Sequence, residues 1–549
     1  MASRIWLYDT TLRDGAQREG IALSLEDKLR LARQLDHLGV PFIEGGWPGA
    51  NPKDAKLFWK LQEEPLPQSR AVAFCSTRRP RKQASEDRML QAILEAGTDW
   101  VTIFGKSWDL HVTEGLKTHL DENLAMIHDT LIFLRAQGRE VIYDAEHWFD
   151  GYKANPSYAL ATLKSAQEAG AKWLVLCDTN GGALPHEVSQ IVKEVVNALN
   201  IEPDISETVQ LGIHAHNDSG TAVANSIAAI TEGVRMVQGT INGYGERCGN
   251  ANLCTLIPNL QIKMGFDCLN DQQLAQLSDT SRLISEIANL APDEHAPFVG
   301  RSAFAHKGGI HVSAVQKNPI TYEHIEPELI GNERRIVISE QSGLSNIISK
   351  AKAFGIELDP KGKVSKDLLE HLKNLEHQGY QFEAAEASFE LLMREALGQR
   401  KMMFRVKGFQ VHCDLLDGDN LPYSSSLATI KVAVGGEDIL EVAEGNGPVS
   451  ALDLALRKAL VNFYPEIANF HLSDYKVRIL NGEAGTGATT RVLLESSNGK
   501  DRWTTVGVSS NILDASYQAV VEAIEYGLLL VKAPPPVFTR RNQTKLVPR

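Results

Sequence analysis

Two histidines spaced one residue apart give the clearest chemical signal in this sequence. His214 and His216 lie in a short, mostly apolar run at 210–216 that is typical of a β-strand. Alternate residues of a strand point to the same side, so both imidazoles can reach one metal ion. The pair alone leaves a second interpretation open, because such histidines can also be packed or hydrogen-bonded inside a protein.

A carboxylate for the same ion is available from Asp14, at the end of the first predicted strand. Two imidazoles and one carboxylate with open coordination positions suit Mn²⁺, Zn²⁺ or Fe²⁺, and Mg²⁺ less well. Asn250, in the glycine-rich segment after the last predicted strand, can add an amide oxygen directly or through water. The sequence therefore predicts a divalent metal site with Asn250 beside the two histidines and the aspartate.

Arg13 and Glu146 also stand at predicted strand ends and carry charges that a metal-assisted reaction can use. Arg13 can bind a carboxylate or stabilise an oxyanion, or it can form an internal ion pair with Glu44 or Glu246. Glu146, near a metal but not bound to it, can act as a general acid or base. A salt bridge to an arginine or a lysine is the competing interpretation for this glutamate.

Two loop segments carry further candidates. Thr179 is followed by glycines 181 and 182, which let a ligand approach the backbone or simply make a tight turn. The segment 305–311 contains His306 and two glycines, and it can fold over a site as a lid or form an ordinary surface turn. Tyr322 can donate a proton or serve only in packing.

The elements that must position these residues repeat one pattern over the first 270 residues. Short β-rich runs alternate with helix-like stretches, of which 24–38 is an example, with Ser24 as N-cap and Gly39 as C-cap. The predicted strands are 5–12, 42–46, 71–76, 100–105, 141–147, 173–178, 210–216 and 236–241. Eight βα units favour a (β/α)₈ TIM barrel over a doubly wound open sheet, and the polar residues above collect at the carboxyl strand ends, where barrels do their chemistry.

Beyond the barrel, which we place at 1–270, the sequence changes character. We expect a mainly helical linker or lid region at 271–395 and a compact α+β module of duplicated βββα type at 400–533. The two predicted helices of that module begin near Gly447 and Asn511, which are 64 residues apart. The proline-containing tail at 534–549 is expected to be disordered.

Composition excludes several classes of function. The 549 residues include 56 Lys and Arg against 69 Asp and Glu, and the net charge of −13 argues against a nucleic-acid partner. No apolar run approaches the ~20 residues that span a bilayer, and the N-terminus lacks a signal-peptide core. Six cysteines without a CxxC pair indicate reduced thiols. We therefore expect a cytoplasmic, multidomain protein without a membrane partner.

Several motifs in combination resemble those of the α-isopropylmalate synthase and homocitrate synthase family. They are LYDTTLRDGAQREG, EGGWPGANPKD, DAEHWFDGYKAN, LCDTNGG, HAHNDSGTAVANS, GYGERCGNANL and FAHKGGIHVSAV. The C-terminal stretch, with VRILNGEAGTGATTRVLLES and WTTVGVSSNILDAS, resembles the family's regulatory dimer domain. The resemblance covers nearly the whole chain.

This resemblance implies a divalent-metal-dependent acyltransferase that joins acetyl-CoA to a small 2-oxo acid in a Claisen-type condensation and then hydrolyses the thioester. The implied metal ligands are Asp14, His214, His216 and Asn250. Arg13 would bind the ketone or carboxylate oxygen, Thr179 the carboxylate, and Glu146 would act in acid–base chemistry. His306, and with it Tyr322, would come from the lid-like segment of a partner subunit and help to activate acetyl-CoA or the hydrolytic water.

The resemblance also implies which 2-oxo acid is used and how the enzyme is regulated. Within the family, the branch that uses pyruvate matches best, and 2-oxoisovalerate is the alternative. Some members of that branch carry an aromatic residue where this sequence has Asp144, so Phe104 on the fourth strand can fill the pocket instead and favour a small substrate. The family further implies a homodimer or larger oligomer and feedback inhibition by a branched-chain amino acid, expected to be isoleucine.

Overall fold

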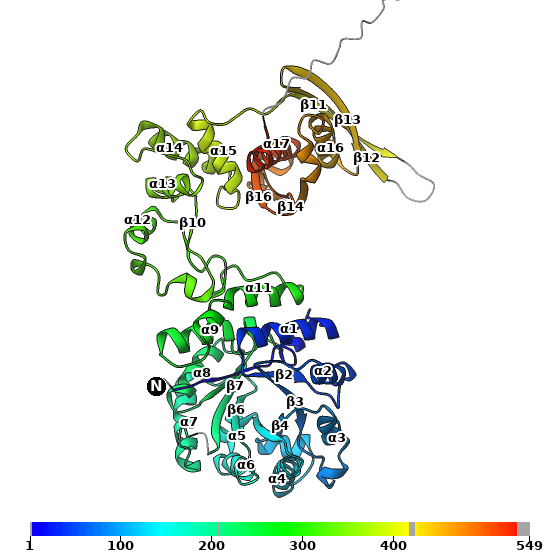
Figure 1. Ribbon diagram of the computed structural model, residues 1–549, viewed down its shortest axis with the longest axis vertical. Helices are drawn as coiled ribbons and strands as arrows, with labels where there is room; N and C mark the ends of the chain where they lie inside the picture. Colours follow the sequence, from blue (N-terminus) through cyan, green and yellow to red (C-terminus); the bar gives the residue numbers. More distant parts are fainter. Residues whose placement is uncertain (1–2, 206–207, 417–422, 535–549) are drawn as a thin grey trace, which may run out of the picture. The chain divides into compact units, whose positions relative to one another are not determined.

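The computed structural model describes residues 3–205, 208–416 and 423–534, and it contains two compact units (Figure 1). The barrel unit comprises the residues up to Phe304 together with 323–334. The C-terminal unit comprises 305–322 and the residues from Arg335 onward. Each unit has its own buried apolar core, so each is described by itself.

Eight parallel strands form a closed barrel in the barrel unit. They are β1 (Trp6–Asp9), β2 (Phe42–Gly46), β3 (Arg70–Ser76), β4 (Trp100–Lys106), β5 (Glu140–Glu146), β6 (Trp173–Asp178), β7 (Gln210–Ala215) and β8 (Met236–Gly239). Each strand pairs with the next, and β8 pairs with β1, so the TIM barrel is confirmed and the open sheet is wrong. The carboxyl ends of all eight strands therefore meet at one mouth.

Helices follow the strands and surround them (Figure 1). They are α1 (Leu25–Leu38), α2 (Pro52–Glu63), α3 (Arg88–Glu95), α4 (Leu120–Ala136), α5 (Trp148–Ala154), α6 (Pro156–Glu168), α7 (Pro185–Leu199), α8 (Ala222–Thr231), α9 (Leu253–Pro258), α10 (Asp271–Leu274) and α11 (Leu277–Ile287). The predicted caps of α1 are confirmed: Ser24 forms a capping box with Asp27, and Gly39 ends the helix with φ +88°. The barrel unit continues past residue 270, since the amide of Asn242 donates to Ser281 O and Ser285 Oγ of α11.

Two strands, β1 and β8, end at least two residues earlier than the sequence predicts, and both ends matter for the site. β1 stops at Asp9, not at residue 12, because the Asp9 carboxylate accepts hydrogen bonds from the Thr11 N–H and hydroxyl and draws the chain into a turn. β8 stops at Gly239, not at residue 241, because Thr240 N–H donates to Ala251 O and the chain folds back on that segment. The polar residues that follow are thereby turned over the barrel mouth.

The C-terminal unit begins with small helical elements. They are α12 (Gly309–Lys317), α13 (Leu344–Ala353), α14 (Lys363–His377) and α15 (Glu386–Ala396), with two short paired strands, β9 (Ala305–His306) and β10 (Arg335–Ile336). The predicted mainly helical region after the barrel is thus confirmed. Its apolar core includes Ile347, Leu372 and Phe389 and extends to Val506 of the strand-rich module.

The strand-rich module contains the predicted duplication. The first copy has β11 (Arg405–Leu416), β12 (Tyr423–Val434), β13 (Glu437–Gly445) and α16 (Pro448–Leu460), and the second has β14 (His471–Ile479), β15 (Thr490–Ser497), β16 (Arg502–Ser509) and α17 (Ile512–Leu530). Each antiparallel sheet packs its buried face against its own helix, which confirms the βββα type. No helix in the described ranges is long and apolar enough to cross a membrane. The predicted disordered tail lies, from residue 535, outside the described residues.

Candidate functional site

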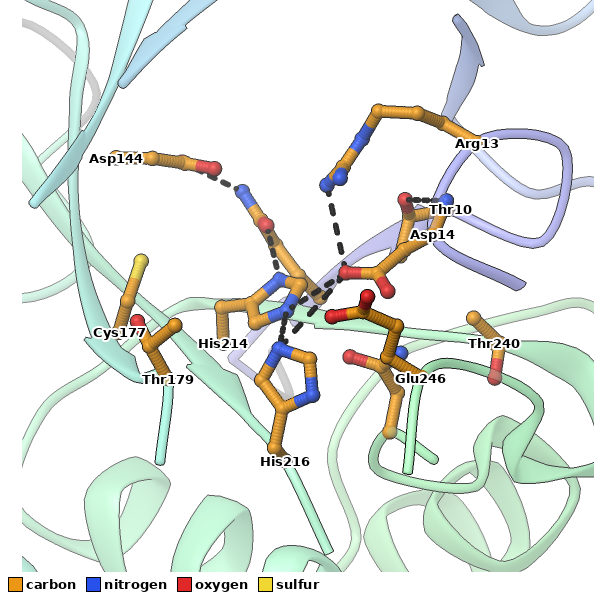
Figure 2. A network of polar contacts seen from close by, with 12 residues as sticks. Thr10, Arg13, Asp14, Asp144, Cys177, Thr179, His214, His216, Thr240 and Glu246 are labelled. Atoms are coloured by element: carbon orange, nitrogen blue, oxygen red, sulfur yellow. Dashed lines mark hydrogen bonds and ion pairs between the residues drawn. The ribbon is translucent and has the colours of Figure 1, made fainter. Parts of the chain in front are cut away.

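Three predicted metal ligands converge at the barrel mouth, where their side chains point toward one another (Figure 2). His214 Nε2 lies 3.3 Å from His216 Nε2 and 3.4 Å from Asp14 Oδ2, and His216 Nε2 lies 3.9 Å from the same oxygen. A point equidistant from these atoms is roughly 2.1 Å from each, within the ~2.0–2.2 Å range of metal bonds to nitrogen and oxygen. The three residues therefore fit one divalent ion.

The local fold explains why these side chains meet. His214 is in β7, and His216 follows the strand and forms a bridge with Asn250. Asp14 is reached through the turn after β1, in which Arg13 N–H and Gly15 N–H both donate to Thr10 O. Only β8 separates β1 from β7 in the closed barrel, so this turn and the β7 end lie close together.

Two buried oxygens support the fit to a metal. Asp14 Oδ1 and Asn250 Oδ1 have no hydrogen-bond partner among the described residues, although their side chains are buried. Asn250 is held by its amide N–H, which donates to Tyr244 O at 3.1 Å. A Cβ at Gly245 would lie 2.2 Å from Asn250 Nδ2, so the glycine is required there. Buried acceptors without donors are the arrangement that a bound cation satisfies.

Electrostatics set the protonation states that a metal ion needs. Burial alone would raise the pKa of Asp14, but the Arg13 charge and the two histidines hold that pKa well below its usual range. Burial, with the neighbouring His214, lowers the pKa of His216 to about 3. Asp14 raises the pKa of His214 against the effect of burial, so a proton and a metal ion compete for that imidazole.

Arg13 is held beside the ligands by a buried carboxylate. Its Nε donates to Glu44 Oε2 at 2.5 Å, its Nη2 lies 3.6 Å from Asp14 Oδ2, and its guanidinium lies 3.9 Å from the centre of the Phe74 ring. Glu44 is fully buried and also accepts from Tyr8 at 2.7 Å. The structure therefore contains the Arg13–Glu44 ion pair that the sequence left as an alternative, and the guanidinium still lines the cavity.

Glu146 and Thr179 lie on the same cavity, as the sequence predicts for strand ends. Glu146 is ion-paired with Lys106, the partner that the sequence could not specify. The Thr179 hydroxyl accepts a hydrogen bond from His147 N–H at 2.9 Å, so its own proton is directed elsewhere and is available to a ligand. The backbone of His147 is in the left-handed region, with φ +53°. This conformation ends β5 and directs the His147 N–H toward Thr179.

The cavity has a volume of about 550 Å³ and one aromatic wall. Phe104 stacks on Phe74 with ring centres 5.1 Å apart, and Trp47 packs edge-on against both. Asp144 of β5 pairs in register with Phe104 of β4 and is buried; burial and the Glu44 charge raise its pKa to about 7. The wall and the acid together limit the space beside the candidate metal ligands.

The sequence did not predict a role for Gln238. Its amide lies between His214 Nδ1, at 2.8 Å, and Asp144 Oδ1, at 3.0 Å. A signal was present, because Gln238 is the single polar side chain in the apolar run at 236–239 and lies in register with His214. Glu246, considered only as a partner of Arg13, also lines the cavity and faces the candidate metal ligands (Figure 2).

His306 and Tyr322 belong to the C-terminal unit. His306 is in β9 and is buried, whereas Tyr322 is 47% exposed and stacks on His311 with ring centres 4.2 Å apart. The other candidate site residues belong to the barrel unit, so the predicted role of His306 and Tyr322 in catalysis stays a prediction.

Comparison with known proteins relates the whole chain to one group of enzymes. The HMGL-like family model matches residues 4–284, the homocitrate synthase post-HMGL domain-like model residues 298–380, and the LeuA allosteric (dimerisation) domain model residues 383–528. An (R)-citramalate synthase of Synechocystis sp. is 72% identical over 96% of this chain and 96% of its own length. Those of Geobacter sulfurreducens and Aquifex aeolicus are 54% and 52% identical, each over 96% of this chain and 98% of their own length.

A probable 2-isopropylmalate synthase of Methanopyrus kandleri is only 30% identical over 95% of this chain and 98% of its own length. The family assignment therefore rests on the relatives that are 52–72% identical over nearly their full length. The family models match the barrel unit, the following helical region and the duplicated module in that order along the chain. The chain belongs to the (R)-citramalate synthase family.

Proposed function

We propose that this chain condenses acetyl-CoA with pyruvate and hydrolyses the resulting thioester, releasing (R)-citramalate and CoA. The observation that carries the proposal is the convergence of Asp14, His214 and His216 beside Arg13 in one small cavity. The family membership supports it, because the relatives that match over their full length are named (R)-citramalate synthases.

Asp14, His214 and His216 would hold a divalent ion, with Asn250 as a further ligand, and Mn²⁺, Zn²⁺ and Mg²⁺ are the candidates. When bound, the ion supplies Lewis-acid polarisation of the ketone of the 2-oxo acid. The ionised aspartate and the neutral His216 are the forms in which these ligands bind metals.

Other side chains of the cavity would bind the substrate and move protons. Arg13, oriented by Glu44, directs its guanidinium at the oxygen on which negative charge develops. Thr179 offers its hydroxyl proton to the substrate carboxylate. Glu146, ion-paired with Lys106, can take up a proton at its carboxylate and return it. Removing a proton from the methyl group of a thioester needs such a base in a fixed position.

His306, with Tyr322, is proposed to help activate acetyl-CoA or the hydrolytic water, contributed by a partner subunit. The support is the resemblance of the segment around His306 to the family motif. Replacing His306 with Asn should lower kcat and leave Mn²⁺ binding unchanged, whereas unchanged kcat would exclude this role.

The aromatic wall formed by Phe104, Phe74 and Trp47 supports pyruvate as the 2-oxo acid. Pyruvate carries a methyl group where 2-oxoisovalerate carries a branched chain, and a rigid stacked wall leaves less room for the larger group. A pocket separates substrates that differ by one methylene by about 1–3 kcal/mol.

We further propose catalysis in 1–270, a linker in 271–395 and regulation in 400–533. The match of 383–528 to the LeuA allosteric (dimerisation) domain supports a homodimer and an amino-acid effector, for which isoleucine is our candidate. All six cysteines are free, as expected in a reducing compartment such as the cytoplasm.

The test is an assay of CoA release with acetyl-CoA and either pyruvate or 2-oxoisovalerate. We expect turnover with pyruvate, (R)-citramalate as the product, and inhibition by isoleucine. Turnover with 2-oxoisovalerate alone would show that the chain is a 2-isopropylmalate synthase and would contradict the proposal.

A further inference from the structure

Three buried polar side chains form a chain of hydrogen bonds behind the candidate metal ligands. His214 of β7 contacts Gln238 of β8 through Nδ1 and Oε1 at 2.8 Å, and Gln238 Nε2 donates to Asp144 Oδ1 of β5 at 3.0 Å. The exposed fractions are 5% for His214, 1% for Gln238 and 4% for Asp144. A polar group this deeply buried destabilises the protein if it lacks a hydrogen-bond partner. Each of the three side chains is therefore restricted to the orientation in which its hydrogen bonds are made.

The acceptor on Asp144 determines which way the Gln238 amide faces. A carboxylate oxygen accepts a hydrogen bond from the amide NH₂, so the NH₂ faces Asp144 and the carbonyl oxygen faces His214. That oxygen can only accept, so His214 must carry its proton on Nδ1. The lone pair of His214 is then on Nε2, the atom that lies 3.3 Å from His216 Nε2 and 3.4 Å from Asp14 Oδ2.

We propose that Gln238 and Asp144 are positioning residues that fix His214 in the tautomer and ring orientation that bind the metal. The inference rests on the metal site of the proposed function. Asp144 then does two things: it lines the substrate cavity, and it orients the Gln238 amide.

The barrel is what makes this chain of contacts possible. His214 and Gln238 face each other directly in the β7–β8 register. Asp144 reaches Gln238 from β5, which is three strands away from β8 in the closed barrel, so the contact crosses the barrel interior. Neither residue is a metal ligand, and neither would be found from a ligand motif.

The test measures Mn²⁺ binding to the full-length, metal-free chain by calorimetry, with Mn²⁺ alone as the probe. Gln238→Met keeps the size of the side chain but removes the acceptor for His214. We expect its Kd for Mn²⁺ to rise about 10–100-fold, the usual effect of losing a partner that orients a metal ligand. The melting temperature of the metal-free chain should also fall, since the variant leaves His214 Nδ1–H and Asp144 Oδ1 without this partner; the Kd for Mn²⁺, measured well below that temperature, is the decisive readout.

A charge-conserving swap provides the matched control. Gln238→Glu alone places two carboxylates side by side, and the repulsion should weaken Mn²⁺ binding. In Gln238→Glu/Asp144→Asn, the amide introduced at position 144 can donate to the carboxylate introduced at position 238, which can still accept from His214 Nδ1–H. We expect the double variant to return to within about threefold of the wild-type Kd, as residues in one network couple strongly.

Asp144→Asn and Asp144→Leu keep the test decisive if Gln238→Met fails to fold. Asp144→Asn retains an acceptor oxygen for Gln238 and should bind Mn²⁺ almost as the wild type does, whereas Asp144→Leu should weaken binding about tenfold or more. Equal Kd values for Gln238→Met and the wild type, or for the two Asp144 variants, would overturn the proposal. A wild type that binds Mn²⁺ but uses only 2-oxoisovalerate would instead contradict the proposed function and leave this inference standing.

Discussion

The substitution Glu44→Gln isolates the effect of one buried charge on the site. Tyr8 donates to Glu44 Oε1, while Thr10 and Arg13 donate to Oε2. A glutamine can place its oxygen at the Oε2 position and its NH₂ toward Tyr8. The Tyr8 hydroxyl can accept from that NH₂ and donate to Thr102, 2.8 Å away. Every hydrogen bond is then kept, and only the negative charge is lost.

The expected cost follows from the position of Arg13. Removing one partner of a buried ion pair typically costs about 3–5 kcal/mol. Arg13 retains Asp14 at 3.6 Å and its side chain is 14% exposed, so we expect the low end, about 3 kcal/mol. The guanidinium should then move toward Asp14 and compete with the metal ion for that carboxylate. We expect the Kd for Mn²⁺ to rise about tenfold and kcat/KM to fall about 10²–10³-fold.

Tryptophan fluorescence can follow the barrel unit during thermal unfolding, because seven of the eight tryptophans are in that unit. We expect the barrel transition of Glu44→Gln to fall by about 4–8 °C. Tyr8→Phe is the control, since it removes the hydrogen bonds of Tyr8 with Glu44 and Thr102, each worth about 1 kcal/mol, and keeps the charge. If Glu44→Gln matched Tyr8→Phe in melting temperature, Mn²⁺ affinity and kcat/KM, the argument from buried charge would be refuted.

Four other predictions concern the metal, the substrate and the C-terminal unit. EDTA treatment and His214→Ala should both abolish CoA release, with Mn²⁺ restoring only the treated wild type; full activity without a divalent ion would contradict the metal site. Phe104→Ala should raise kcat/KM for 2-oxoisovalerate relative to pyruvate by about 10–100-fold, and an unchanged ratio would show that this wall does not select the substrate. Burial raises the pKa of Glu522 from 4.5 to about 7, so the folded C-terminal unit holds a proton that the unfolded chain loses. Its melting temperature should therefore fall as pH rises from about 4.5 to 7, and Glu522→Gln should flatten that dependence; a flat wild-type profile would contradict this. Deleting 400–549 should abolish isoleucine inhibition while the barrel transition persists, and inhibition that survived the deletion would place the effector elsewhere.

The helical region before residue 400 and the strand-rich module after it are packed together more closely than their sequences suggest. The sequence predicts a boundary near residue 400, with a mainly helical region before it and a strand-rich module after it. In the structure, Tyr380 donates to Gln518, and Ser388 donates to Glu522 and accepts from Val506 N–H. The helices before 400 therefore share contacts with the second βββα copy. We expect the deletion to expose these surfaces and lower the helix content of 344–396, measurable by circular dichroism.

Local pattern was enough to determine the elements of this protein and most of its candidate site. Alternating short apolar runs and amphipathic stretches indicate βα units, and the capping residues Ser24 and Gly39 mark one helix to the residue. The spacing of His214 and His216 places both on one side of an extended segment whatever surrounds it. The 64-residue offset likewise predicted two copies of one module. These features depend on neighbours within a few residues, which the sequence shows directly.

Closure of the barrel decided the rest. Whether Arg13 faces Glu44, whether Lys106 reaches Glu146, and how Gln238 links His214 to Asp144 all depend on which strands are adjacent and in what register. A tertiary contact also holds the turn that presents Asp14, because Thr11 in that turn accepts a hydrogen bond from Ile241 N–H beyond β8. Such contacts join residues up to 230 positions apart. No periodicity within a segment can specify them, since the energy that selects one partner over another arises only when the strands have come together.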